Sequence, residues 1–207
     1  MKEILEKIIA NVLTAIYQPF LLSIALSALF MFFHLYAVDN GLGGKGYKQA
    51  MKSWCLYFKK DKYFRLHFFC TFSIALVLFQ TLINRNMWVN PVQSVMEGWW
   101  IYKLNPTTGE RVLTTECIEN LILFMPFAWS FTLYSANRHD DHNNRTIWAN
   151  VFYVGKTVFY ASLAIEFTQL FLRLGTFQIS DLVYNTLGGI IMTVIVNWVR
   201  VFQKKNN

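Results

Sequence analysis

The sequence predicts an all-α protein, a polytopic membrane helix bundle of about five transmembrane helices. Of its 207 residues, 55% are hydrophobic and only 15% are charged, whereas soluble domains carry about 25% charged residues. The apolar residues also fall in blocks, each about as long as the roughly 20 helical residues that cross the hydrocarbon core. Such blocks are too long for strands, and a helix satisfies its own backbone hydrogen bonds in lipid.

We expect one membrane domain over residues 1–207, with spans at 14–38, 64–83, 117–136, 150–172 and 182–202. The first block lacks a small-residue cleavage site after a short apolar run. It is therefore expected to be a retained helix and not a signal peptide.

A basic segment, "YKQAMKSWCLYFKKDKYFR", follows the first span at 47–65. In a helix, Met51, Trp54 and Phe58 would share one face, and the lysines would lie largely on the other. This pattern predicts an interfacial helix on an anionic inner leaflet. The preceding "GLGGKGYK" lacks the Gly-Lys-Ser/Thr ending of a phosphate-binding loop, so we expect a turn there. Because the basic residues of 47–65 lie beside two spans, we expect no nucleic-acid partner.

Positive charge is concentrated on one side of the predicted bundle. With five spans, the first inner loop, the loop after the third helix and the C-terminal tail share a side and carry twelve Lys and Arg residues, against six on the other side. Basic loops are retained in the cytoplasm. We therefore expect a multi-pass protein of the cell membrane with its N-terminus outside and its C-terminus cytoplasmic.

The remaining loops are less specific. The outer loop 84–116 contains Trp88, Trp99, Trp100 and Tyr102, which fits either a segment at the lipid boundary, re-entrant within 88–104, or a plain extracellular loop. The segment "ANRHDDHNNR" (136–145) lacks the helical His pair of a zinc protease. We expect a solvated turn there, no metal site and no cofactor, and a packing role for the three cysteines.

Polar residues meet at the outer ends of three predicted helices. Glu166, Gln169 and Arg173 are three and four residues apart, so they share one helical face. Asp181 and Asn185 start the next span, and Asn120 lies near the start of the third. These six residues form our predicted functional polar cluster.

The expected depth of these polar side chains in the membrane indicates that they need partners. A charged carboxylate at mid-membrane costs roughly 3 kcal/mol, so Glu166 is expected to face a partner such as Arg173, Asn185 or Asn120. The cluster either locks the helices together or forms a ligand or catalytic site. Pro126 is expected to kink the third helix, and Gly188 and Gly189 to allow close helix packing.

The motifs "ENLILFMPFAW" and "IEFTQLF…G…SDLVYNTLGG", within 117–190, resemble the VanZ-like family of bacterial membrane proteins. The matching positions are Asn120, Leu123, Phe124, Pro126, Phe127, Glu166, Gln169, Gly175, Asp181, Asn185, Thr186, Leu187 and Gly188. Ala128, Thr176 and Ser180 depart from the family pattern, which has Gly, Arg and a second acid there.

The resemblance implies an integral membrane protein of the kind named for resistance to teicoplanin, a lipoglycopeptide that acts at the outer membrane face. Our first hypothesis is that the chain alters antibiotic susceptibility or envelope-lipid interactions. Its partners would be membrane lipids, lipid-linked cell-wall precursors or a lipoglycopeptide. The alternatives are a membrane enzyme acting on a lipid headgroup and a small transporter. No catalytic residue is assigned, because no nucleophile triad, zinc motif or nucleotide loop is present.

Overall fold

The computed structural model describes residues 2–38, 46–83, 87, 90–105, 109–138 and 146–206. Its elements are, in order, α1 (Lys2–Val38), α2 (Tyr47–Lys60), α3 (Lys62–Leu78), the π-helix η1 (Phe79–Ile83), β1 (Tyr102–Leu104), β2 (Arg111–Leu113), α4 (Glu116–Leu123), α5 (Met125–Arg138), α6 (Ile147–Leu172) and α7 (Ile179–Asn206). The predicted turn at 136–145, most of 41–48, and Trp88 lie largely outside the described residues.

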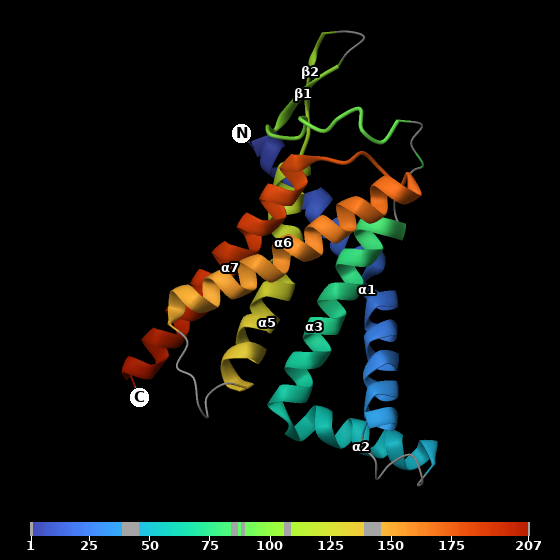
Figure 1. Ribbon diagram of the computed structural model, residues 1–207, viewed down its shortest axis with the longest axis vertical. Helices are drawn as coiled ribbons and strands as arrows, with labels where there is room; N and C mark the ends of the chain where they lie inside the picture. Colours follow the sequence, from blue (N-terminus) through green and yellow to red (C-terminus); the bar gives the residue numbers. More distant parts are fainter. Residues whose placement is uncertain are drawn as a thin grey trace.

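The long helices run back and forth between two ends of the molecule (Figure 1). The N-terminus and the antiparallel hairpin of β1 and β2 lie at one end, which we call the hairpin end. The α2 helix and the C-terminus lie toward the other, the α2 end. The helices therefore have the alternating arrangement of a polytopic membrane protein.

Four helical stretches in the described residues are long and apolar enough to cross a membrane: Ile4–Ala37, Lys62–Ile83, Glu116–Ser135 and Ile179–Gln203. The predicted membrane helix bundle is thus confirmed as a fold class. The fifth predicted span corresponds to α6, whose 26 residues would reach about 39 Å. It is not among the four, and it carries Lys156, Glu166 and Gln169 within its turns.

The third span is interrupted at Phe124, two residues before Pro126. Proline has no N–H to donate to the carbonyl four residues earlier, and its ring crowds that carbonyl. One helix ends at Leu123 and the next begins at Met125, with Phe124 at φ −93° and ψ −3° between them. Helix α4 can therefore take a different direction from α5.

Gly188 and Gly189 lie where α7 meets two other helices. An ideal Cβ on Gly188 would lie 2.8 Å from the Leu121 carbonyl carbon of α4, and closer still to its oxygen. A Cβ on Gly189 would lie 2.8 Å from Cγ2 of Val158 in α6. The absence of side chains at these positions lets α4 and α6 pack closely against α7.

The predicted basic helix is present as α2, and it lies across the ends of α1 and α3 (Figure 1). Trp54 and Phe58 pack against a core cluster that contains Met31, Phe64 and Phe68. Part of the apolar face that we expected to enter the leaflet is thus used against the protein. The lysines of α2 are exposed.

Candidate functional site

The turn between α6 and α7 brings the two helix ends together. Helix α6 ends at Arg173, which adopts the left-handed conformation at φ 55°, and Gly175 follows at φ 140°. The Leu174 N–H donates to the Gln169 carbonyl, 2.9 Å away, as in a common helix C-terminal motif. Because the turn is tight, the last turns of α6 lie beside the first turns of α7.

Glu166 and Gln169 point into the protein and tie this turn to its surroundings. Glu166 is 2% exposed, and its Oε2 accepts a hydrogen bond from the Gln178 backbone N–H at 3.0 Å. Gln169 is 3% exposed and donates from Nε2 to the Thr81 carbonyl, 2.7 Å away in η1. The carbonyls of a terminal helical turn lack partners within the helix, so Gln169 satisfies one of them.

Two further amides join neighbouring helices. Asn120 of α4 donates from Nδ2 to Oδ1 of Asp181 in α7, at 2.6 Å. Asn185 donates from Nδ2 to the Ser162 hydroxyl at 2.8 Å, and its Oδ1 is buried without a hydrogen-bond partner among the described residues. The structure thus places five predicted cluster residues at the junctions of α4, α6, α7 and η1.

Arg173 is not brought to the others. It is exposed, and no ion pair links it to Glu166 in the described part of the chain. The expected spacing of three and four residues holds only within a helix, and α6 ends at Leu172. The Gln178 backbone N–H donates to Glu166, where we had expected the guanidinium group of Arg173.

Residues 91–99 form a cover over the α6–α7 turn. Backbone bonds join the Phe177 N–H to the Pro91 carbonyl at 2.8 Å and the Ile179 N–H to the Val95 carbonyl at 3.1 Å. The Ser180 hydroxyl donates to the Glu97 carbonyl at 2.6 Å, a bond that an acid, the usual residue at this family position, would not make when ionised. This segment is bound to the bundle instead of forming a free loop.

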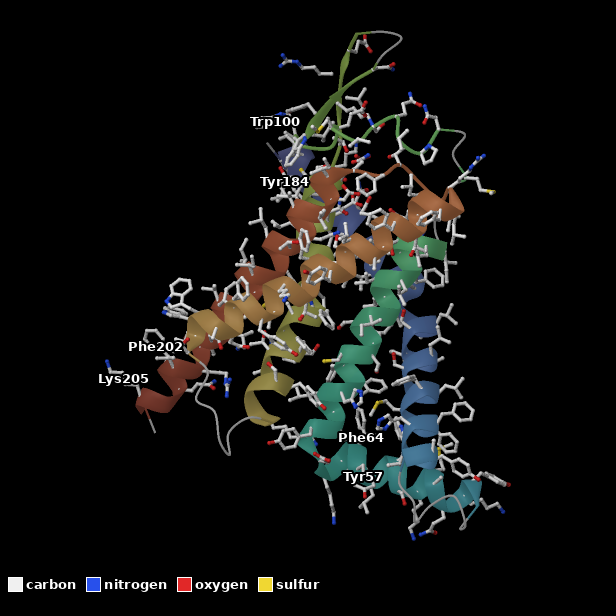
Figure 2. All side chains as sticks on the ribbon, viewed as in Figure 1. Tyr57, Phe64, Trp100, Tyr184, Phe202 and Lys205 are labelled. Carbon is white, nitrogen blue, oxygen red and sulfur yellow. The ribbon has the colours of Figure 1, made fainter. Side chains whose placement is uncertain are left out.

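The cover continues into the hairpin through two more contacts. The Tyr184 hydroxyl of α7 donates to the Trp99 carbonyl at 2.8 Å, and Figure 2 shows Tyr184 and Trp100 at the hairpin end. Glu97 and Lys103 form an ion pair at 2.7 Å. Hydrogen bonding to Lys103 lowers the pKa of Glu97, and the same bond raises the pKa of Lys103.

A cavity of about 690 Å³, which we call the vestibule, opens at the hairpin end. Its charged and polar lining residues are Lys7, Asn11, Gln80, Ser94, Lys103, Asn105, Thr114, Thr115, Glu116, Glu119, Asn120, Thr176, Gln178 and Asp181. Of the predicted cluster, Asn120 and Asp181 line the vestibule directly. Arg173 is not among the lining residues.

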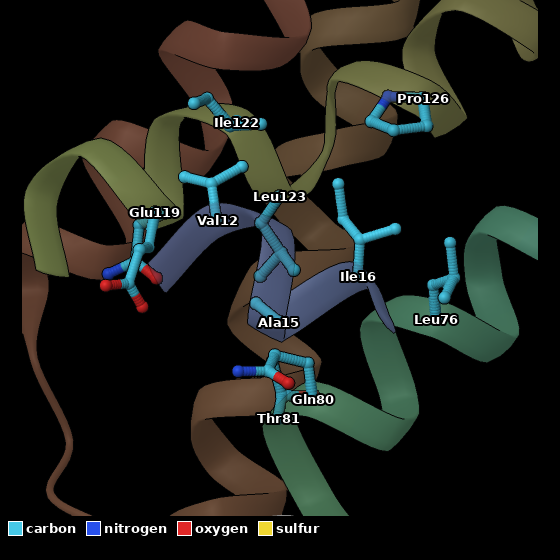
Figure 3. Close-up of a pocket in the computed structure, with 11 residues that line it drawn as sticks. Val12, Ala15, Ile16, Leu76, Gln80, Thr81, Glu119, Ile122, Leu123 and Pro126 are labelled. Atoms are coloured by element: carbon cyan, nitrogen blue, oxygen red, sulfur yellow. The ribbon is translucent and has the colours of Figure 1, made fainter. Parts of the chain in front are cut away.

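A narrow apolar groove adjoins the vestibule, since the two share Gln80, Glu119 and Asn120. It is lined otherwise by Val12, Ala15, Ile16, Leu76, Thr81, Ile122, Leu123 and Pro126. Figure 3 shows Glu119 and Gln80 beside the apolar side chains of α1 and α4. Oε1 of Gln80 is buried without a hydrogen-bond partner among the described residues.

Several of these residues were missed in the sequence analysis. Lys7 and Asn11 precede the predicted first span by a few residues, yet α1 begins at Lys2 and carries them into the vestibule. Asn11 donates from Nδ2 to the Thr115 hydroxyl at 2.6 Å, and that hydroxyl donates to Glu119. A signal was present in the sequence, since Asn11 and Gln80 are isolated amides in apolar surroundings.

The vestibule combines charged and polar side chains with an adjoining apolar groove. It offers carboxylates, amides and two lysines next to an apolar groove. No group of three or more His, Cys, Asp and Glu side chains suited to a metal ion occurs among the described residues. This arrangement suits a molecule with a polar part and an apolar chain.

Comparison with known proteins agrees with the motifs. The family model described as VanZ/LLP1 matches residues 20–200, which include α2 to α6, most of α7, about half of α1, and the lining of the apolar groove from α3 to α5. Neither the curated proteins nor the solved structures gave a match. The resemblance inferred from the motifs is confirmed, and the chain belongs to the VanZ/LLP1 family.

Proposed function

We propose that this protein binds an amphiphile at the outer membrane face and thereby lowers susceptibility to teicoplanin-type glycopeptides. The polar part of the amphiphile would occupy the vestibule, and its acyl chain would occupy the apolar groove. The observation that supports this most is the junction of the two at Gln80, Glu119 and Asn120. A purely aqueous ligand would gain nothing from the groove.

The proposed side of the membrane rests on charge. The α2 end carries the exposed lysines of α2, and positive charge is retained in the cytoplasm. The hairpin end would then face outward, where glycopeptides act. In a cysteine-free background, an impermeant thiol reagent should label Asn90→Cys in intact cells and spare Lys52→Cys. Labelling of Lys52→Cys alone would place the vestibule inside.

The acyl chain gives the proposal its specificity. Teicoplanin carries such a chain, as lipid-linked cell-wall precursors do, and vancomycin does not. Burial of a chain in an apolar groove contributes about 0.8 kcal/mol per methylene. The protein is therefore expected to affect teicoplanin more than vancomycin, either by binding the drug or by altering how the precursors are presented.

The test is to overproduce the chain in a susceptible Gram-positive host and to measure the inhibitory concentrations of both drugs. The wild type should raise the teicoplanin value more than the vancomycin value. Asp181→Asn, which removes the carboxylate that accepts from Asn120, should abolish the rise. Lys52→Gln at the α2 end should retain it, with protein amounts matched by immunoblot. Unchanged values for both drugs would refute the resistance proposal.

A further inference from the structure

Lys156 occupies an unusual place for a charged side chain. It is exposed on α6, next to Gly155, whose added Cβ would lie 3.0 Å from Cγ1 of Ile190. Ile190 is at the middle of the Ile179–Gln203 span of α7, and α6 and α7 lie side by side (Figure 1). Lys156 therefore lies at the depth of the bilayer centre, on a surface that faces lipid.

The protein gives this cation little compensation. The Lys156 Nζ lies 5.8 Å from the centroid of the Tyr160 ring, within range of a cation–π interaction. No ion pair involving Lys156 occurs in the described ranges. A charged group at this depth is costly unless it finds an opposite charge or reaches toward the interface. Such a residue indicates a partner outside the chain.

Lys156 also lies in a groove on this face, which we call the lateral groove. The groove has a volume of about 850 Å³, and Lys156 is the one charged residue among the described side chains that line it. Its walls include the aromatic residues Trp148, Phe152, Phe159 and Tyr160. The vestibule and the lateral groove share no lining residue, so they are separate sites.

The groove extends from the membrane boundary toward Lys156. Trp148, at the start of α6, is 77% exposed, and tryptophan favours the boundary between water and lipid. Eight helical residues separate it from Lys156, a rise of about 12 Å. A lysine near this depth can extend its charged end toward the interface, which would cover part of that distance. A lipid headgroup that entered the groove would span the remaining distance between the boundary and Lys156.

We propose that the lateral groove binds an anionic phospholipid from the leaflet at the α2 end, with its phosphate on Nζ of Lys156 and an acyl chain along the aromatic walls. Charge complementarity and the apolar walls favour this occupant. A second copy is disfavoured, because a twofold contact centred on the groove would bring two Lys156 side chains together. The site is independent of the proposed effect on glycopeptides.

The experiment is native mass spectrometry of the full chain, with phosphatidylglycerol and phosphatidylcholine of identical acyl chains added in turn. The wild type should prefer phosphatidylglycerol. Lys156→Gln should weaken its binding about fivefold, since a basic residue near an anionic lipid contributes about that factor. Lys156→Arg should keep the preference, and so should Arg111→Gln, which removes an exposed charge at the hairpin end.

The control for folding is the thermal midpoint of each variant in detergent without added lipid, which should match the wild type. Equal binding of the two lipids by the wild type, or unchanged phosphatidylglycerol binding by a folded Lys156→Gln variant, would overturn the proposal. So would efficient dimer formation in membranes through Phe152→Cys in a cysteine-free background, because it would assign the groove to a second copy.

Discussion

Gly188→Ala should be among the most damaging single-methyl additions in this protein. The new Cβ would lie 2.8 Å from the Leu121 carbonyl carbon and would overlap its oxygen. The obstacle is backbone, which cannot move aside by changing rotamer. Helix α4 would have to move away from α7, and the hydrogen bond between Asn120 and Asp181 lies along the same contact.

The size of the effect follows from two opposing contributions. Overpacking costs about 1–3 kcal/mol, and a rigid backbone obstacle places this case at the upper end. Alanine regains about 1 kcal/mol in helix propensity relative to glycine. The net loss is therefore about 2 kcal/mol, which corresponds to a decrease of roughly 4–8 °C in the thermal midpoint of a chain of this size.

The assay is thermal unfolding of purified protein in detergent, with two matched variants of the same chemistry. Gly189→Ala meets the Val158 side chain at 2.8 Å and should lose less stability. Gly155→Ala meets Cγ1 of Ile190 at 3.0 Å, the longest of the three closest contacts, and should lose the least stability. The reasoning fails if Gly188→Ala melts at or above the wild type, or if Gly155→Ala is the worst of the three.

Three further predictions follow from other parts of the structure. Ala15→Phe fills the apolar groove, so overproduction of this variant should no longer raise the inhibitory concentration of teicoplanin; a full rise would remove the groove from the proposal. Arg173→Gln should leave the melting temperature within about 1 °C of the wild type because this side chain is exposed. A large decrease in melting temperature would instead support the expected pairing of Arg173 with Glu166. Glu97→Gln should destabilise the cover at neutral pH, by less than about 1 kcal/mol for so exposed a pair. Because the pKa of Glu97 is lowered, its contribution to stability is present above the unfolded pKa and is lost as pH falls through the folded pKa. Because the pKa of Lys103 is raised, its contribution is present below the unfolded pKa and is lost as pH rises through the folded pKa. Hydrogen exchange of the 91–99 amides should therefore differ between Glu97→Gln and wild type at neutral pH and converge in acid, and identical exchange at neutral pH would contradict the pair's role.

The sequence predicted those features that depend on local composition and on the period of a single helix. Apolar blocks located the helices, and polar residues near the ends of three of them indicated that Asn120, Asp181 and Asn185 would lie at similar depth. Pro126 marked the interruption between α4 and α5, where a carbonyl loses its donor. These inferences need only the geometry of a single helix and the thickness of a bilayer.

The rest depends on contacts between distant segments. The extension of α1 to Lys2 brings Asn11 to Thr115, a contact between distant segments that the pattern within one helix does not show. Arg173 was assigned to the helical face of Glu166, yet a left-handed residue ends the helix there. The cover over residues 177–180 uses backbone bonds, and these leave no pattern in the side chains.

Occupancy of the vestibule and the apolar groove by one amphiphile is the central claim, and photo-crosslinking in cells tests it most directly. A photoreactive residue at Val12, in the groove, should capture a molecule with an acyl chain, identified by mass spectrometry, and Asp181→Asn should abolish the capture. The same probe at Leu29, an exposed position on α1, should capture bulk lipid whether or not Asp181 is changed. If Val12 captures nothing, or the same lipids as Leu29 regardless of Asp181, the account is contradicted.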